Sequence, residues 1–376
     1  MQFHYIKKRN FIILLIIVCI KCCLLHPTVA QTPSRDSPWI RTSSFIVLPI
    51  AFYTPETRLG FGAAAAYTFR FRDEPDTLRP AQIQPGVAYT LENQLLLYLP
   101  FQIFYHHNQY NIYGELGYYR YFYRYYGIGN DTPTDAEELY TAHFPRVRLN
   151  VLRRLHPHVF VGLRYWFDDY RVVRRAAQGS LIQDTDTGSQ GGVVSAWGVV
   201  ANFDSRNNLF YPTRGMLAEL VLLDNTRLLG SDFYYTRLSL DAAVYHTFPW
   251  QHTLALNGFT DLTFGDPPFF QMPLLGGTKK LRGHWEGRFR DRKLLLLQAE
   301  YRFPLFWRLG MVAFAGAGKV APDLPTLMRA GTTVHYSVGG GLRVRLSRKD
   351  PIHIRIDVGF DENGQYLPYI TIGEAF

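Results

Sequence analysis

The sequence predicts an all-β protein: a single antiparallel β-barrel of about sixteen strands that crosses a membrane and follows an export signal. From Ser44 onward the chain repeats one unit, about ten residues of alternating polarity and then a turn. Aromatic residues make up 15% of the chain, with 25 Tyr and 27 Phe, which is typical of the aromatic girdles of a membrane barrel. The mean hydropathy is −0.10, and no run approaches the roughly 18 apolar residues of a spanning helix. A helical membrane protein is therefore excluded.

The N-terminus is typical of an export signal. A basic start is followed by the apolar run 11–20 and by small residues that end at Ala30. We expect residues 1–30 to be a signal peptide, although Lys21 leaves a retained short anchor open as an alternative. All three cysteines, Cys19, Cys22 and Cys23, lie in this segment. Cleavage would leave a mature chain without cysteine, which would exclude disulfides, thiol catalysis and Cys-based metal sites.

The charge balance argues against nucleic acid as a partner. The formal net charge is +9, and removal of the predicted signal with its four basic residues leaves about +5. A basic rim that faces anionic lipid head groups explains this modest excess. We expect outer-membrane lipids among the partners and no nucleic acid.

The alternation predicts which face of each strand meets lipid. In the segment 158–168, Arg164 and Asp168 alternate with Leu163 and Phe167, so the apolar set faces lipid and the polar set faces inward. A soluble sandwich also alternates but keeps charge outside, and it rarely needs so many strands. The predicted strands are 44–53, 59–71, 83–91, 94–105, 110–121, 141–153, 158–168, 193–204, 214–224, 233–246, 252–264, 293–303, 309–319, 336–346, 352–360 and 366–376.

An even strand count places both chain ends on the same side, which we expect to be the periplasm. A short periplasmic segment, 31–43, then precedes a barrel domain, 44–376. The long connections, 122–139, 170–192, 265–292 and 321–334, all fall on the outer side. The short connections, 156–158, 249–251, 305–308 and 348–351, fall on the inner side, with 72–82 as a longer exception. Long outside and short inside is the asymmetry of outer-membrane barrels.

The connection 265–292 carries too much charge for a lipid-facing strand. The strand after it places Gln298, Glu300 and Arg302 on its polar face. Because a carboxylate on an inward face needs a cation, Glu300 is the candidate partner for an arginine of this loop.

A family resemblance rests on this loop. Gly276 and Gly277, followed by Leu281-Arg282-Gly283-His284, resemble the Val-Arg-Gly-Tyr/Phe signature in the sixth outer loop of the BamA/TamA family of outer-membrane barrels. The resemblance implies a loop that folds back into the barrel, with Arg282 paired to acids on the inner wall and Glu300 as one of them. The alternative is a generic basic surface loop, because the motif is short.

Further matches extend the resemblance over most of the chain. Asp204 and Arg206, followed by Pro212 and Gly215, resemble a periplasmic turn of the family. The last strand resembles the family's C-terminal insertion signal, with its end at Tyr369, Gly373 and Phe376. The segment 126–130 resembles a recurrent outer-loop turn.

Two departures from the family pattern stand out. The thirteenth strand has Gly316 where the family has a second lumen acid, so another acid must replace it or Glu300 must act alone. Only about thirteen residues separate Ala30 from the first strand, too few for POTRA domains, so we expect either a partner that supplies client delivery or a barrel with another use.

Other chemistries have weaker support. A hydrolase would need Ser, His and an acid at one rim, and His284, His335 and Ser337 lack a nucleophile motif around them. Histidine pairs in short turns and Asp184 with Asp186 in a mobile polar loop are poor metal sites. The aromatic run 118–126 suits a girdle with two arginines for lipid phosphate better than a stacking site for sugar or nucleic acid. We expect no enzymatic activity, no cofactor and no metal.

The resemblance implies assembly or translocation of protein or lipid substrates at the outer membrane of a bacterial cell. A lateral seam between the first and last strands would serve an unfolded protein client, together with a periplasmic or lipoprotein partner. A plugged or narrowly conducting pore with a structural or lipid-contacting role remains the alternative.

Overall fold

A computed structural model describes residues 40–376, except 73, 76, 184 and 347–351. The predicted signal 1–30 lies outside the described residues. The strands are β1 Ile40–Thr54, β2 Arg58–Phe71, β3 Ala81–Ile83, β4 Gly86–Thr90, β5 Leu95–Tyr105, β6 Tyr110–Tyr125, β7 Glu138–His156, β8 Val159–Arg174, β9 Gly191–Asp204, β10 Gly215–Asn225, β11 Tyr235–Thr247, β12 Thr253–Gly265, β13 Leu274–Leu275, β14 Phe289–Arg290, β15 Lys293–Phe306, β16 Leu309–Ala321, β17 His335–Arg345, β18 His353–Asp361 and β19 Tyr366–Ile372.

Helix is confined to short pieces in the connections. These are η1 Thr134–Ala136, η2 Arg227–Leu229, η3 Pro249–Gln251, η4 Phe269–Gln271 and α2 Leu324–Met328. In the described part of the chain, no helix has the length and apolar character needed to cross a membrane.

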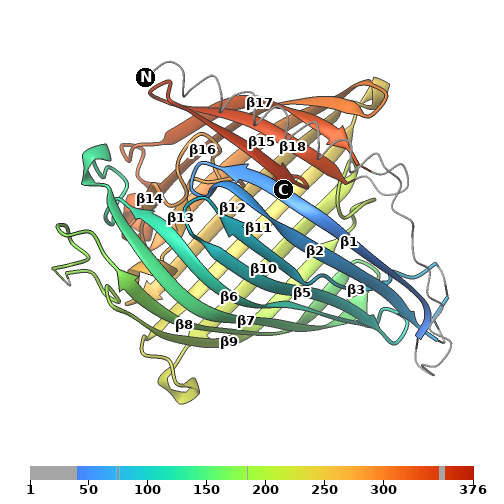
Figure 1. The fold of residues 1–376 in the computed structure, drawn as a ribbon, viewed down its shortest axis with the longest axis horizontal. Helices are drawn as coiled ribbons and strands as arrows, with labels where there is room; N and C mark the ends of the chain where they lie inside the picture. The colour runs from blue at the N-terminus through green and yellow to red at the C-terminus, as the bar shows by residue number, and fades with distance from the viewer. Residues whose placement is uncertain (1–39, 73, 76, 184, 347–351) are drawn as a thin grey trace.

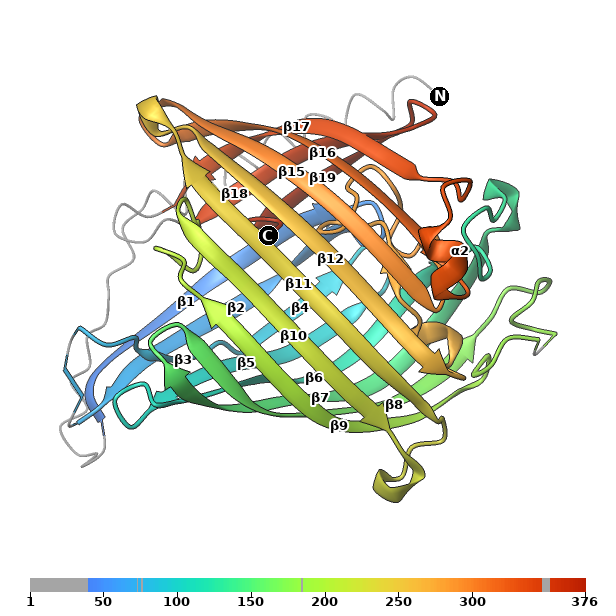
Figure 2. The ribbon, with the colours of Figure 1, turned by 180° about the vertical axis from the view of Figure 1, so that it is seen from behind.

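The strands close into a single antiparallel barrel (Figures 1 and 2). Each strand of the wall pairs with the next wall strand along the chain, and β19 returns to β1. Strands β13 and β14 are not part of the wall and pair with each other, so β12 pairs with β15. Strands β3 and β4 both pair with β2 and β5, so they form one wall position, interrupted at Gln84 and Pro85. Because proline has no N–H to donate to the ladder, Pro85 explains the interruption. The predicted all-β barrel of sixteen strands is confirmed.

The barrel is closed unevenly. Strand β1 pairs with β2 from Ile40 to Thr54, whereas it pairs with β19 at one position, Tyr53 opposite Ile370. The remainder of β1, toward Ile40, continues past the end of β19. The seam between first and last strands is therefore much shorter than the other joints of the wall.

Both seam strands differ in length from the prediction. Strand β1 begins at Ile40, four residues before the predicted start, and β19 ends at Ile372 rather than Phe376. At Gly373 the backbone φ is +85°, a conformation that favours glycine, and the chain turns there into the lumen. Phe376 then packs on Ala243, Tyr245 and Ala255 of the inner wall.

Side-chain alternation follows the predicted pattern. On β8, Leu163 is 59% exposed on the outer wall, whereas its neighbour Arg164 is 8% exposed inside. Arg164 donates to Glu219 of β10 at 2.8 Å, over the inner face of β9, which pairs with both strands. The polar interior thus pairs its charges with one another.

The four longest connections, 126–137, 175–190, 266–292 and 322–334, lie at the same end of the barrel. The longest described connection, residues 266–292, joins β12 to β15 and is called loop six below. It folds back into the barrel, where its two ends pair as the β13–β14 ribbon (Figure 1). The connection 126–137 joins it, because Gly129 bridges to Arg290. At the opposite end of the barrel, the connection 205–214 turns into the lumen, where the carbonyl of Pro212 meets Arg302.

Candidate functional site

Loop six is tightly shaped around Arg282. Leu281 has a φ of +55° and is fully buried, and its N–H donates to Gln298 Oε1 at 3.1 Å. Gly283 has a φ of +120°, and a Cβ there would lie 2.9 Å from the backbone of Phe360. Only glycine fits so close to β18 in that conformation. This turn directs the side chain of Arg282 toward the inner wall of the barrel.

Gly276 and Gly277 begin the tight part of the loop. Both have positive φ, at 111° and 103°. The N–H of Gly277 donates to the carbonyl of His284 at 3.0 Å, which closes the loop onto its own motif. The two glycines therefore set the return of the chain rather than contact the wall.

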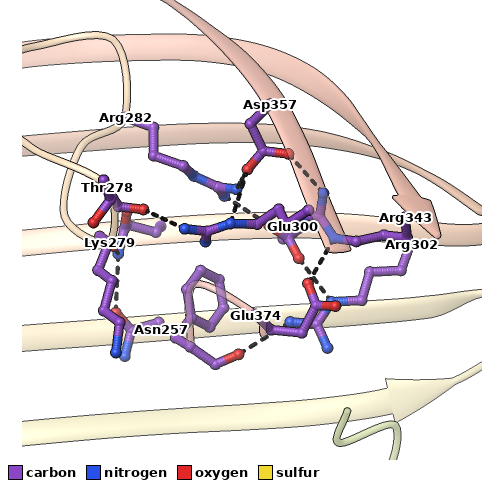
Figure 3. A network of polar contacts seen from close by, with 12 residues as sticks. Asn257, Thr278, Lys279, Arg282, Glu300, Arg302, Arg343, Asp357 and Glu374 are labelled. Atoms are coloured by element: carbon purple, nitrogen blue, oxygen red, sulfur yellow. Dashed lines mark hydrogen bonds and ion pairs between the residues drawn. The ribbon is translucent and has the colours of Figure 1, made fainter. Parts of the chain in front are cut away.

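Arg282 forms two ion pairs inside the barrel (Figure 3). Its Nη2 lies 2.7 Å from Glu300 Oε2 on β15, and its Nη1 lies 2.5 Å from Asp357 Oδ2 on β18. Its guanidinium also lies over the ring of Phe314, 3.6 Å from the centroid. A guanidinium suits this place because its planar fork serves two carboxylates and an aromatic face at once.

Asp357 occupies the role of the acid missing at Gly316. Gly316 lies on β16, where an added Cβ would be 3.1 Å from Leu281 Cδ1. The loop thus packs where an acidic side chain would stand, and the second carboxylate comes instead from β18. Alternation puts Asp357 on the inward face of the predicted strand 352–360 but does not assign it to the loop.

The carboxylates join further arginines into one buried network (Figure 3). Glu300 Oε1 accepts from Arg302 Nε at 2.7 Å, and Asp357 Oδ1 accepts from Arg343 Nη1 at 2.6 Å. Glu374, just past β19, accepts from Arg343 Nε at 2.7 Å. All of these side chains are almost fully buried. Buried charges are costly unless they are paired and hydrogen-bonded. Here Glu300 and Asp357 each accept from at least two arginines, and Glu374 accepts from the buried Arg343.

Arg302 connects the Glu300 pair, which holds loop six, to the turn that enters from the opposite end of the barrel. Besides Glu300, it donates to the carbonyl of Pro212 and to that of Phe376, both at 3.0 Å. It thereby links the inner wall, the 205–214 turn and the C-terminus. The sequence pattern places Arg302 beside Glu300 on one face of the strand but gives it no role; that adjacency is the signal that could have identified it.

The turn motif folds on itself before it meets Arg302. Asp204 Oδ1 accepts from the backbone N–H of Arg206 at 3.1 Å and from its Nε at 3.0 Å. Gly215 has a φ of +95°, and a Cβ there would lie 2.2 Å from the carbonyl oxygen of Ser205. With Asp204, Arg206 and Gly215 fixed, the turn presents the carbonyl of Pro212 to Arg302.

Loop six touches both sides of the seam. On one side, the N–H of Gly283 donates to the phenolic oxygen of Tyr369 on β19 at 3.0 Å. On the other, the N–H of Glu286 donates to Glu56 Oε1, in the β1–β2 turn, at 2.9 Å. The predicted seam residues Tyr369 and Phe376 thus face the lumen, and Tyr369 connects the last strand to the loop.

Two histidines, His284 and His335, share the carboxylate of Glu362 near the outer end of the barrel. Glu362, in the β18–β19 turn, lies 3.0 Å from His284 Nε2 and 2.8 Å from His335 Nδ1. His335 Nε2 lies 2.9 Å from the carbonyl oxygen of Asn130. Burial lowers the pKa of His284, so this side chain is neutral at neutral pH. Among the described residues Ser337 Oγ has no hydrogen-bond partner, so it is not joined to either histidine as a nucleophile.

The interior as a whole can restrain a loop and a seam. Two segments enter the lumen, loop six from one end and the 205–214 turn from the other, and they meet through Glu300 and Arg302. In the described part of the chain, no group of three or more His, Asp or Glu is placed to hold a metal ion.

Comparisons with known proteins agree with this architecture. The family model of the Omp85 superfamily domain matches residues 45–376. No curated protein matches the chain at a significant level. Among solved structures, BamA from Haemophilus ducreyi lacking POTRA domains 1–3 is similar with a TM-score of 0.58 and 14% identity, over 89% of this chain and 70% of that one. CdiB from Acinetobacter baumannii is similar with a TM-score of 0.54 and 9% identity, over 88% of this chain and 59% of that one.

Proposed function

Because the chain belongs to the Omp85 superfamily and is a bacterial outer-membrane protein, we propose that it assembles or translocates protein substrates through the seam between β1 and β19. The observation that carries the proposal is the single paired position at this seam, Tyr53 opposite Ile370. Such a short joint costs little to open, and an opened joint presents backbone N–H and C=O groups that can template a client strand.

The inward turn at Gly373 supports this reading. The N–H of Gly373 makes a last backbone hydrogen bond to His353 of β18; the turn then removes residues 374–376 from the wall and places Phe376 against the inner wall. The long unmatched part of β1, toward Ile40, is then the edge on which a client strand would begin to pair. A purely structural barrel would gain from complete closure, since unpaired backbone groups are costly in lipid.

Loop six is the proposed control element of the seam. It reaches β19 through Tyr369 and the β1–β2 turn through Glu56, so it holds both sides from within. Opening the seam would require release of at least one of these contacts. A partner protein that supplies and orients clients is part of the proposal, as is a non-enzymatic mechanism.

A disulfide across the seam tests the proposal. Residues directly opposite in an antiparallel pair have Cα atoms about 4.5–5.5 Å apart, which suits a disulfide. Tyr53→Cys with Ile370→Cys locks the seam, and Tyr53→Cys with Leu59→Cys locks β1 to its full partner β2 as the matched control. Cys19, Cys22 and Cys23 precede the described residues, so residues 40–376 hold no competing thiol.

The readout is the folding rate of a second, urea-unfolded outer-membrane barrel in lipid vesicles that contain the purified protein. We expect the protein to accelerate folding, the oxidised seam pair to abolish the acceleration, and a reductant to restore it. The control pair should have no effect in either state. Full acceleration by the locked barrel would overturn the role of the seam.

A plugged barrel is the second candidate function. The observation in its favour is the meeting of loop six and the 205–214 turn at the Glu300–Arg302 pair, which fills the lumen from both ends. This candidate predicts no acceleration of client folding and a low conductance that rises when Arg302 is removed.

A further inference from the structure

Three basic side chains stand in a row on the lipid-facing wall. Arg120 of β6 is directly opposite His143 of β7, and His143 is directly opposite Arg171 of β8. Cross-strand neighbours on one face have Cβ atoms roughly 4.5–5.5 Å apart, so Arg120 and Arg171 flank His143 from its two sides, and an anion between them can accept from both guanidiniums. The row therefore favours a bound anion. These strands form part of the wall nearest the viewer in Figure 1.

The protein itself neutralises little of this charge. Arg171 pairs with Asp169 on its own strand, at 2.6 Å, and remains 73% exposed. Within the described residues, His143 Nε2 is buried without a hydrogen-bond partner. Glu92, the acid in the β4–β5 turn, forms an ion pair with Arg58 at 2.5 Å. One carboxylate thus faces two guanidiniums and an imidazole.

The row lies at the depth of lipid head groups. Tyr110 of β6, opposite the exposed Tyr105, marks the short-turn end of the wall. From Tyr110 to Arg120 is ten residues, which at about 3.3 Å each and a tilt of about 40° spans roughly 25 Å along the membrane normal. That matches the roughly 25 Å apolar band of such barrels, so Arg120 stands at the outer interface.

An apolar groove of about 680 Å³ begins just below the row. Its floor is the small-residue run 63–65 of β2, and its walls include Val47, Val87, Leu97, Leu116 and Tyr118. Tyr118 is two residues below Arg120 on the same face of β6, which is roughly 7 Å along the strand. The volume lies in the range of roughly 300–1,000 Å³ that holds small ligands.

We propose that this wall binds a lipid whose phosphate head group is held by Arg120, His143 and Arg171 and whose acyl chains lie in the groove. Guanidinium groups suit phosphate because they donate two parallel hydrogen bonds to it. The groove suits acyl chains because its lining is almost entirely apolar and faces the bilayer. The site extends to Val47 of β1, so the bound lipid lies beside the free edge of the seam strand.

Native mass spectrometry of the detergent-purified protein tests the proposal. Titration with dioleoyl phosphatidic acid should give a saturable lipid adduct, and dioleoylglycerol, which lacks the phosphate, should bind at least about tenfold more weakly. Arg120→Gln with Arg171→Gln should weaken phosphatidic acid by a similar factor. Arg227→Gln with Arg329→Gln removes the same charge from exposed loop positions and should leave binding unchanged.

A second pair of variants tests the groove. Ala63→Phe fills its floor and should weaken phosphatidic acid, whereas Ala315→Phe on the lipid-facing side of β16, away from the groove, should not. Heat-dependent gel mobility verifies that each variant is folded. Equal binding of dioleoylglycerol, unchanged binding by the Arg120 and Arg171 variant, displacement by an equal concentration of inorganic phosphate, or a second copy of the chain in place of lipid would each overturn the site.

Discussion

The backbone N–H of Gly283 donates a hydrogen bond to the phenolic oxygen of Tyr369, 3.0 Å away, and this contact ties loop six to the last strand of the barrel. On the opposite side of the seam the loop is tied to Glu56 through the N–H of Glu286. The wall at the seam has one paired position, Tyr53 with Ile370. The loop therefore contributes to closure from inside the barrel, where lipid cannot compete for its polar groups.

The first prediction concerns Tyr369. Tyr369→Phe leaves the buried N–H of Gly283 without its acceptor, which costs about 1–3 kcal/mol. We expect faster proteolysis of loop six and a lower temperature for the heat-dependent shift in gel mobility. Tyr366→Phe on the same strand, where the side chain is 64% exposed, is the matched control and should behave as wild type. Identical behaviour of the two variants would show that the contact does not restrain the loop.

The second prediction concerns the pair Arg282 and Glu300. Removal of one partner from a buried ion pair costs about 3–5 kcal/mol because the other charge is left uncompensated. Arg282→Ala and Glu300→Ala should each loosen loop six and broaden single-channel conductance. The double variant should lose less than the sum of the two single losses, because the two side chains share one ion pair, although Arg282 also pairs with Asp357 and Glu300 also pairs with Arg302. Additive losses in this cycle would mean that the two side chains act independently.

The third prediction concerns Arg302, whose guanidinium serves Glu300, Pro212 and Phe376 together. Arg302→Lys keeps the charge, but a compact ammonium cannot reach acceptors on three separate segments. We expect the variant to lose thermal stability almost as fully as Arg302→Gln does. The same change at the exposed Arg153 should be neutral. Retention of full stability by Arg302→Lys would show that charge alone matters at this position.

The fourth prediction is a pH dependence of loop six. Glu286 keeps exposed surface inside the barrel, but partial removal from water by the surrounding wall and then the neighbouring Glu56 raise its pKa to about 7. A carboxyl with a raised pKa in the folded state is favourable while protonated, and this contribution is lost as pH rises from about 4.5 through about 7. Loop six should therefore be more resistant to protease at pH 5 than at pH 8.

Glu286→Gln provides the control for that prediction. The amide cannot ionise, so the variant should be equally resistant at both pH values and should resemble the wild type at pH 5. Each protease rate is normalised to a folded soluble substrate, because protease activity itself changes with pH. A pH effect of the same size in the Gln variant would assign the dependence to another group.

The wall of the barrel follows from local sequence pattern. Side chains alternate between the two faces of a strand, so Leu163 against Arg164 is enough to identify the lipid face and the lumen face. The same reasoning placed loop six between its two strands and set Glu300 inside the lumen. The end of β8 was the least accurate, because the strand continues to Arg174 rather than stopping at residue 168. The ends of β1 and β19 were each four residues off, and Gly373 has no local signal that distinguishes a turn into the lumen from a continued strand.

The arrangement across the lumen depended on tertiary structure. Asp357 is 75 residues from Arg282, and the partners of Arg302 lie 90 and 74 residues away in Pro212 and Phe376. Alternation states only that a residue points inward; which inward residues meet depends on the tilt and stagger of sixteen strands closed on one another. The sequence by itself therefore determined the wall and its charged interior, and closure of the barrel decided which charges pair and how short the seam is.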